Sequence, residues 1–349
     1  MASALLMLFL VVALALAFDY VNGFHDAANA VATVVSTGVL PPRTAVLLAA
    51  VCDFAGAFFG VGVAKMIGGN IAEPASITQV VVAAALVGAI FWNLLTWYYG
   101  IPSSSSHALI GALVGAVWCH RTINGAPAGG ALWGLLSSEG VTLTLKALVI
   151  SPLVGMLGGF TLMVILTWLV VRLRPTVVNK GFRVLQLGSS GFMAVAHGSN
   201  DAQKSMGIIT LSLATYAAGQ GESAAASGAD LHVPVWVIIA CATAMALGTA
   251  SGGWRIMKTM GHKIIKLRPI NGFAAETAAA VTILIATHLK APVSTTHVIS
   301  SSIMGVGASK RVSAVRWGVA RNMLVAWILT IPVSALVAAG VYALLRVVL

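Results

Sequence analysis

The sequence predicts an all-α, polytopic membrane protein built from two related halves of opposite orientation. Hydrophobic residues make up 59% of the 349 positions and charged residues 8%, whereas a soluble domain carries about 25% charged residues. Apolar stretches recur along the whole chain. At about 20 residues for each helical crossing, they predict about ten to twelve membrane segments. The short alternating strands of a membrane barrel do not occur in the sequence.

The first predicted membrane segment is the apolar run Leu5–Phe18. It lacks the Lys or Arg that precedes the core of a secretory signal, and it leads directly into a polar motif, so we expect it to remain part of the protein. The cysteines Cys52, Cys119 and Cys241 show no paired spacing. They therefore predict neither a disulfide framework nor a zinc site.

The formal net charge is +11, but the basic residues lie in short loops between apolar segments. This placement favours positive-inside topology over nucleic-acid binding. The basic stretch Arg172–Arg183 contains Pro175 and separates the two halves. We expect a first half at 1–171, a short cytoplasmic connection at 172–183 and a second half at 184–349.

Two motifs occur twice in the same order, which indicates an internal repeat. The matching segments are Gly23–Ala30 with Gly198–Ser205, and Pro102–His107 with Pro292–His297. The loop Gly69–Thr78 holds an acidic residue and no base, whereas its counterpart Gly261–Gly272 is basic. Because Lys and Arg prefer the cytoplasmic side, the opposite charge bias predicts inverted repeats with a substrate site at the midplane.

The first motif places Asp26 and Asp201 at equivalent positions inside predicted spans. An ionisable side chain there costs about 3 kcal/mol even on lenient scales, so it usually marks an ion or substrate path. Carboxylates attract a cation or a proton and repel an anion. We therefore expect Asp26 and Asp201 to hold the coupling ion, H⁺ or Na⁺, and they could also form a divalent metal site. The neighbouring His25 is a candidate proton carrier.

The second motif combines a proline with a run of hydroxyl residues. Proline suits the first turn of a helix, so Pro102 and Pro292 predict helices that begin inside the membrane, in re-entrant hairpins or broken helices. Such an N-terminus binds oxyanions through its free N–H groups and its dipole. His107 and His297 are expected to fix the hairpin ends. The expected anion ligands are Ser103, Ser104, Ser105, Ser106, Ser294, Thr295 and Thr296.

At these residues the sequence resembles the PiT family of inorganic phosphate transporters, in particular the bacterial low-affinity permeases. The family motif Gly-Ala-Asn-Asp-x-x-Asn-Ala looks like Gly23–Ala30 and, in its second copy, Gly198–Ser205. The likeness extends through Gly272–Glu276 and Arg321–Trp327, and it covers nearly the whole chain. It implies phosphate between the hairpin tips and the Asp/Asn motifs. It also implies coupling roles for Asp53 and Glu276.

The resemblance adds Asn29 and Asn200 to the expected phosphate ligands. Lys204, at the position of Asn29 in the second copy, either binds phosphate as a point charge or forms an ion pair with Asp201. Phe24-His25 replaces Ala-Asn of the family motif, and Gln203-Lys204 replaces the residues that lead to Asn in the second copy. The first replacement resembles proton-coupled bacterial members, so the coupling ion stays open between H⁺ and Na⁺.

The predicted function is secondary active symport of inorganic phosphate, as the free anion or as a metal complex. A permease for another oxyanion such as sulfate fits the same residues. An intramembrane Ser/His hydrolase is disfavoured because no Gly-x-Ser-x-Gly elbow occurs, and we expect no enzyme activity and no covalent cofactor. The expected partners are phosphate and the lipid bilayer, without nucleic acid. The expected location is a plasma membrane, the inner membrane of a bacterium, and a homodimer stays open.

Overall fold

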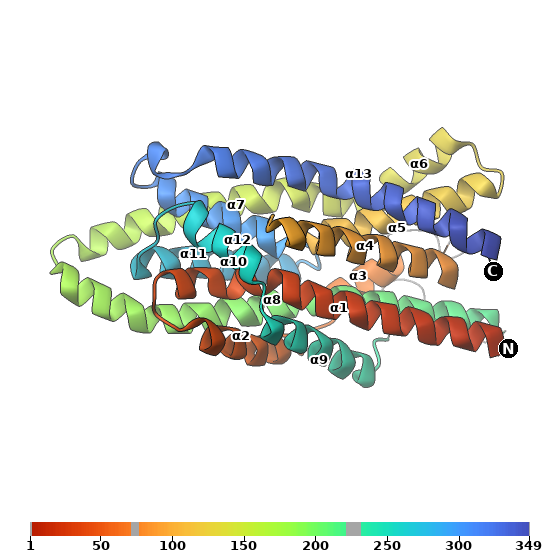
Figure 1. The fold of residues 1–349 in the computed structure, drawn as a ribbon, viewed down its shortest axis with the longest axis horizontal. Helices are drawn as coiled ribbons and strands as arrows, with labels where there is room; N and C mark the ends of the chain where they lie inside the picture. Colours follow the sequence, from red (N-terminus) through yellow and green to blue (C-terminus); the bar gives the residue numbers. More distant parts are fainter. Residues whose placement is uncertain (1, 71–76, 221–231, 349) are drawn as a thin grey trace.

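A computed structural model describes residues 2–70, 77–220 and 232–348 of the chain, and all regular secondary structure in this part is helical. The helices form an elongated bundle whose two termini lie at the same end (Figure 1). The elements are α1 (Ala2–Ser36), α2 (Pro42–Gly56), α3 (Gly62–Asn70), α4 (Gln79–Tyr99), α5 (Ser105–Ile123), α6 (Ala128–Leu136), α7 (Glu139–Val170), α8 (Pro175–Gly219), α9 (Val235–Ser251), α10 (Trp254–Lys258), η3 (Thr259–Lys263), α11 (Pro269–His288), α12 (Thr295–Ala308), η4 (Val312–Ala314) and α13 (Trp317–Val348).

Within the described residues, five helices are long and apolar enough to cross a bilayer individually: α1, α4, α7, α11 and α13. A sixth candidate is the pair formed by α9 and Trp254–Lys263, which is bent by 57°. The chain is thus a helical membrane protein, as predicted. The expected ten to twelve segments exceed the helices that meet this requirement alone, because most of the others are short and the 45-residue α8 carries the second copy of the polar Asp motif.

Corresponding helices of the two halves run in opposite directions. Helix α1 runs away from the end that holds the termini, whereas α8, with the second copy of the motif, runs back toward it (Figure 1). The last helices, α7 and α13, are opposed in the same way. The inverted repeat predicted from the loop charges is therefore present. Glu73, which contributed to that comparison, lies outside the described residues.

The expected connection at 172–183 is mostly helical. Helix α7 ends at Val170 and α8 begins at Pro175, because proline is well suited to the first helical position. Only the turn at 171–174 is loop. The turns that follow α7, η3 and α12 all lie at the end opposite the termini (Figure 1). Basic residues gather at this end: Arg172, Arg174, Lys266, Arg268, Lys310 and Arg311.

Two helical hairpins enter the bundle from opposite ends. In the first, α4 ends at Gly100, whose φ of 64° suits glycine, and α5 begins at Ser105. In the second, α11 is followed by Lys290 at a φ of 59°, and α12 begins at Thr295. Both hairpins were expected. The prolines were predicted to lie in the first helical turn. In the structure they precede it, in non-helical chain.

Serine side chains begin both hairpin helices instead. The Ser104 hydroxyl accepts a hydrogen bond from the His107 backbone N–H at 3.2 Å, and Ser294 accepts one from the His297 N–H at 3.2 Å. A side-chain oxygen at this position satisfies one of the N–H groups that lack a partner within the helix. The serine cap therefore decides where each helix starts, and each proline stiffens the chain before it.

The two hairpin tips touch each other near the middle of the bundle. The Ser106 hydroxyl donates to the carbonyl of Val293 at 2.9 Å, and the ring centroids of His107 and His297 are 4.9 Å apart. Trp327 on α13 joins both tips, because its indole N–H donates to the Pro102 carbonyl at 3.1 Å and its ring stacks on His297 at 3.9 Å. Both histidines thus lie at the junction of the two tips.

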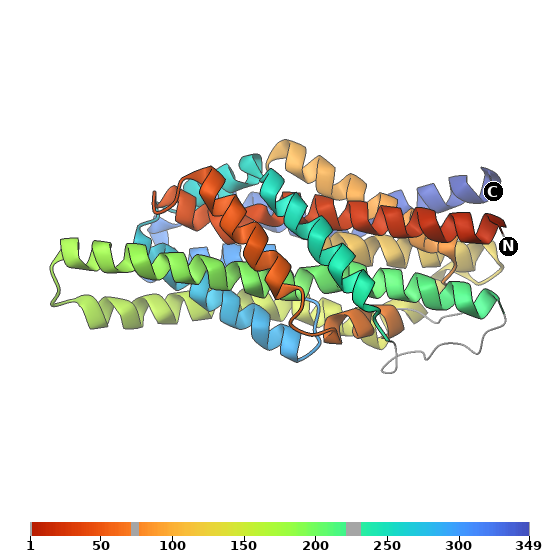
Figure 2. The same ribbon diagram turned by 90° about the horizontal axis from the view of Figure 1, so that it is seen from below.

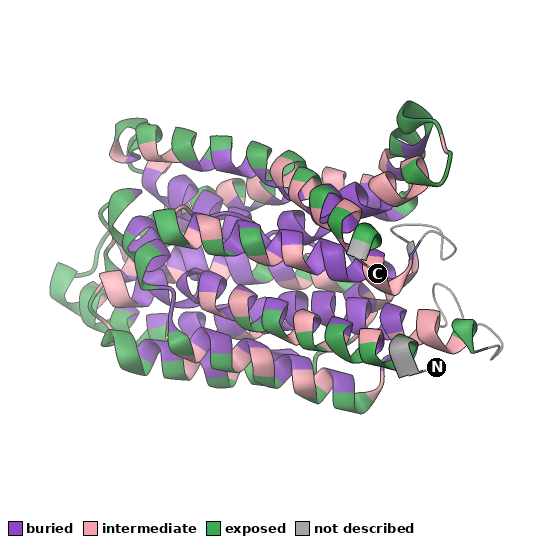
Figure 3. Cartoon of the chain, turned by 45° about the vertical axis from the view of Figure 1, so that its right-hand side comes forward, coloured by how far each residue is buried: buried purple, intermediate pink, exposed green. Residues whose placement is uncertain are grey.

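Helices of one half pack closely against helices of the other. Helices α2 and α9 cross the bundle obliquely side by side (Figure 2), and the motif glycines allow each of them to pack on the motif helix of the other half. A Cβ at Gly198 of α8 would lie 2.2 Å from the Asp53 carbonyl oxygen of α2. A Cβ at Gly23 of α1 would lie 2.2 Å from the Met245 carbonyl oxygen of α9. Buried residues run through the interior, and exposed ones cover the ends and outer faces (Figure 3).

Candidate functional site

The hairpin tips meet the two motif helices at one buried polar centre. Asp26 of α1 accepts hydrogen bonds from Ser105 at 3.3 Å and from Thr296 at 3.2 Å. Asp201 of α8 accepts one from Thr295 at 3.3 Å. Ser105 and Thr295 are the first residues of α5 and α12, so each carboxylate contacts the helix start of its own half.

Two further polar side chains point into the same centre. Asn29, one turn beyond Asp26, donates to Thr295 at 3.2 Å and to Thr296 at 3.0 Å. On α8, the Lys204 ammonium donates to Asp201 at 2.6 Å, and both side chains are buried. The ion pair, one of the two roles considered for Lys204, is therefore present.

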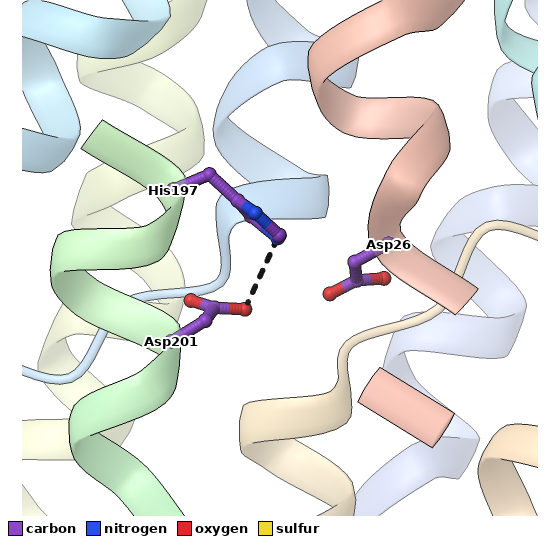
Figure 4. Close-up of side chains that lie close together, drawn as sticks. All are labelled: Asp26, His197 and Asp201. Atoms are coloured by element: carbon purple, nitrogen blue, oxygen red, sulfur yellow. Dashed lines mark ion pairs between the residues drawn. The ribbon is translucent and has the colours of Figure 1, made fainter. Parts of the chain in front are cut away.

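Sequence reasoning missed His197, which lies between the carboxylates. Its Nε2 is 3.6 Å from Oδ2 of Asp201, and one ligand atom each from Asp26, His197 and Asp201 fall within 4.8 Å of one another (Figure 4). His197 precedes Asp201 by four residues and therefore shares its helix face. That spacing was the signal available in the sequence. Two carboxylates and an imidazole form a donor set that suits divalent transition metals.

His197 also links the centre to Asp53. Its Nδ1 is 3.0 Å from Oδ1 of Asp53, whose second oxygen accepts a hydrogen bond from Thr249 at 2.6 Å. All three side chains are buried. Asp53 was singled out only by family resemblance. The imidazole of His197 thus bridges Asp53 and Asp201.

His25 and Asn200 occupy equivalent positions and make comparable contacts. His25 Nδ1 is 2.7 Å from Asp26, and its Nε2 is 3.1 Å from the Thr96 hydroxyl near the end of α4. Asn200 donates to the Thr287 hydroxyl near the end of α11 at 2.9 Å. Each residue therefore ties its motif helix to the first helix of a hairpin. Only His25 can also carry a proton beside a carboxylate.

Five of the ten expected anion ligands converge at the centre: Asn29, Ser105, Lys204, Thr295 and Thr296. The other five have structural partners. Ser104 and Ser294 cap helices, Ser106 joins the tips, Ser103 bonds Thr96 at 2.8 Å, and Asn200 bonds Thr287.

Glu276 belongs to a separate polar cluster on α11. Its carboxylate accepts hydrogen bonds from the hydroxyls of Thr33 and Ser189, and from the Gln186 amide at 3.2 Å. Thr33 is seven residues beyond Asp26, which is about 10 Å along a helix. Gln186 in turn accepts a hydrogen bond from Thr37 at 2.9 Å. This cluster therefore lies between the centre and the basic end of the bundle.

The model of the family described as "Phosphate transporter family" matches residues 22–338. The chain belongs to this family. A probable low-affinity inorganic phosphate transporter of Rhizobium meliloti is 50% identical over 333 residues, which cover 95% of this chain and 94% of the relative. One of Bacillus subtilis with the same description is 48% identical and covers 99% and 98%. The resemblance read from the motifs is confirmed.

A solved structure described as "The sodium-dependent phosphate transporter" shares the fold. It matches with a TM-score of 0.83 at 23% identity and covers 98% of this chain and 100% of that one. Phosphate transporter family members are transporters, so the expectation that the chain is not an enzyme is also confirmed.

Proposed function

We propose that this chain is a secondary active transporter that carries inorganic phosphate across the bacterial inner membrane together with H⁺ or Na⁺. One observation supports this most directly. The starts of two inverted helices meet two buried carboxylates at one centre, as Asp26 with Ser105 and Asp201 with Thr295. Anion donors and cation acceptors are thus combined in one site, which is what symport of an anion with a cation requires.

The anion side consists of the helix starts. The first N–H groups of α5 and α12 have no partner within their helices, and the dipole of each helix favours negative charge there. The hydroxyls of Ser105, Thr295 and Thr296 lie beside them, and Lys204 adds a positive charge. Together these groups provide donors for several oxygens of a tetrahedral phosphate.

The cation side consists of the acidic groups. Asp26 and Asp201 would repel a phosphate dianion, and Lys204 balances only one of them. A cation or proton at this place reverses the local electrostatics and allows the anion to bind. His25 beside Asp26 and His197 between Asp201 and Asp53 are placed to carry protons. The same donors also fit a divalent metal that enters bound to phosphate.

Transport follows from the inverted repeat. Rocking of one set of helices against the other exposes the centre alternately to the two sides. The basic end of the bundle is the cytoplasmic one under the positive-inside rule. A cation and an anion that share one buried site leave together more readily than either leaves alone, which couples the two fluxes. We also propose a homodimer, which light scattering in detergent tests.

The decisive test is uptake of radiolabelled phosphate into proteoliposomes. Imposed proton and sodium gradients are applied separately, and unlabelled sulfate serves as competitor. We expect one gradient to drive accumulation above equilibrium and sulfate at equal concentration to compete poorly. Failure of both gradients to drive uptake excludes symport. Equal competition by sulfate would show that the substrate is a broader class of oxyanions than phosphate. A valinomycin clamp of the membrane potential serves as the control.

A further inference from the structure

The polar stripe of α1 continues beyond the central site. Asp19, Asn22, Asp26 and Asn29 follow one another at helical spacing, so they lie on one face of α1. Asp19 and Asn22 are fully buried, at 0% exposure. Helix α1 runs from the end with the termini toward the basic end (Figure 1). Asp19 therefore lies about 10 Å from Asp26, toward the end with the termini.

Other helices place polar groups beside this part of α1. Helices α1 and α4 run in the same direction and meet where His25 contacts Thr96. Asn22 and Asn93, each three residues earlier, therefore face the same α1–α4 interface. On the opposite side, Ser205 of α8 lies next to the Asp19 carboxylate, as does the Cys241 thiol of α9. Helices α8 and α9 thus contact the acid, and α4 faces α1 at the neighbouring Asn22.

These polar atoms have no hydrogen-bond partner of good geometry among the described residues. They are both carboxylate oxygens of Asp19, both amide atoms of Asn22 and of Asn93, and the Ser205 hydroxyl. All four side chains are fully buried. Burial of an isolated charged carboxylate is very costly, so the group must hold a proton or a cation. Carboxylate, amide and hydroxyl oxygens are the ligands that a hard cation prefers.

We propose that Asp19, Asn22, Asn93 and Ser205 form a second cation site, where the coupling ion binds before it reaches Asp26 and Asp201. This inference rests on the proposed symport. Asp201 and Lys204 are close enough to act electrostatically on Asp19, so the occupancy of this site and that of the centre influence each other. At the equivalent position of the second half, 175 residues later, stands Ala194. Asp19 therefore has no acidic counterpart in the second half, and in this proposal the coupling ion enters from the end of the bundle that holds the termini.

The test compares Asp19→Asn, Asp19→Glu and wild type in proteoliposomes. For each, two quantities are measured: the concentration of driving cation that gives half-maximal uptake, and phosphate counterflow without a gradient at saturating cation. We expect Asp19→Asn to raise the half-maximal cation concentration by about tenfold or more, as loss of a charged ligand implies, with counterflow nearly unchanged. Asp19→Glu retains the charge and should restore most of the cation response.

Glu139→Gln is the matched control, because it also neutralises a carboxylate but at an exposed position. Unchanged cation dependence in Asp19→Asn overturns the inference, and so does an equal loss of counterflow and cation response. If Asp19→Asn does not fold, Asn93→Ala replaces it, and a normal cation response there also overturns the site. A wild type that responds to neither cation refutes the symport itself, which separates that failure from a failure at Asp19.

Discussion

The ammonium nitrogen of Lys204 lies 2.6 Å from a carboxylate oxygen of Asp201, and both side chains are buried. The equivalent pair in the first half is Asn29 and Asp26, in which the carboxylate has His25 as its close partner at 2.7 Å. One half of the centre therefore carries a permanent cation and the other a titratable one. This difference makes Asp26 the carboxylate that is more available to a coupling ion.

Replacing Lys204 with methionine should destabilise the protein. The change leaves the Asp201 carboxylate buried without its cation, which costs about 3–5 kcal/mol. We expect a lower melting temperature in detergent and loss of phosphate uptake. Adding Asp201→Asn should recover most of the melting temperature without recovering uptake. A single variant that melts like wild type would show that the ion pair contributes little.

Single substitutions of the central hydroxyls should weaken phosphate binding without abolishing transport. Thr295→Val removes one donor among several, so we expect about a tenfold rise in the phosphate concentration for half-maximal uptake. Thr243→Val on the exposed face of α9 is the control. Complete loss of activity with normal folding would instead indicate an indispensable group, as a nucleophile would be.

His197→Gln should change the pH dependence of uptake. The imidazole lies 3.0 Å from Asp53 and 3.6 Å from Asp201, and glutamine retains hydrogen bonding but cannot carry a proton. Under a proton gradient, we expect the pH profile of uptake by the variant to differ from that of the wild type, because the substitution removes a group that can carry a proton. A pH profile that keeps the wild-type shape assigns the proton to another group.

Trp327→Ala should loosen both hairpin tips. It removes the stack on His297 at 3.9 Å and the hydrogen bond to Pro102 at 3.1 Å. Loss of a buried tryptophan costs about 3–5 kcal/mol, so the melting temperature and the phosphate affinity should both fall. Trp327→Phe keeps the stack and loses only the hydrogen bond. An equally large effect of both variants would argue against a role for the stack.

Gly198→Ala should disrupt the packing of α8 on α2, because the new Cβ would lie 2.2 Å from the Asp53 carbonyl oxygen. Overpacking of this kind costs about 1–3 kcal/mol, and here it also displaces the Asp53–His197 pair. Gly188→Ala on the same helix meets no atom within 4 Å. Its melting temperature should equal or exceed that of wild type. Equal behaviour of the two variants would contradict the close contact between α8 and α2.

The repeated motifs allowed several residues of the central site to be identified from the sequence alone. Asp26, Asp201 and Thr295 were recognisable because a polar residue that recurs at equivalent positions in apolar sequence needs a functional reason. Asn29 was added by the family resemblance. Hairpins with their ends inside the bundle followed from the same logic. The residue at which each hairpin helix starts could not be predicted in the same way. Proline and serine both favour a helix start, they lie two residues apart, and the local sequence does not show which of them decides it.

The sequence by itself determined the membrane environment, the inverted repeat and the residue types at the centre, since these follow from composition, period and charge. Only the tertiary structure decided which side chains meet. His197 lies beside Asp53 and Asp201, Glu276 lies apart from them with Thr33, and four of the seven expected hydroxyl ligands serve the scaffold. The physical reason is that these contacts join helices far apart in the chain, and close packing at the motif glycines sets their register.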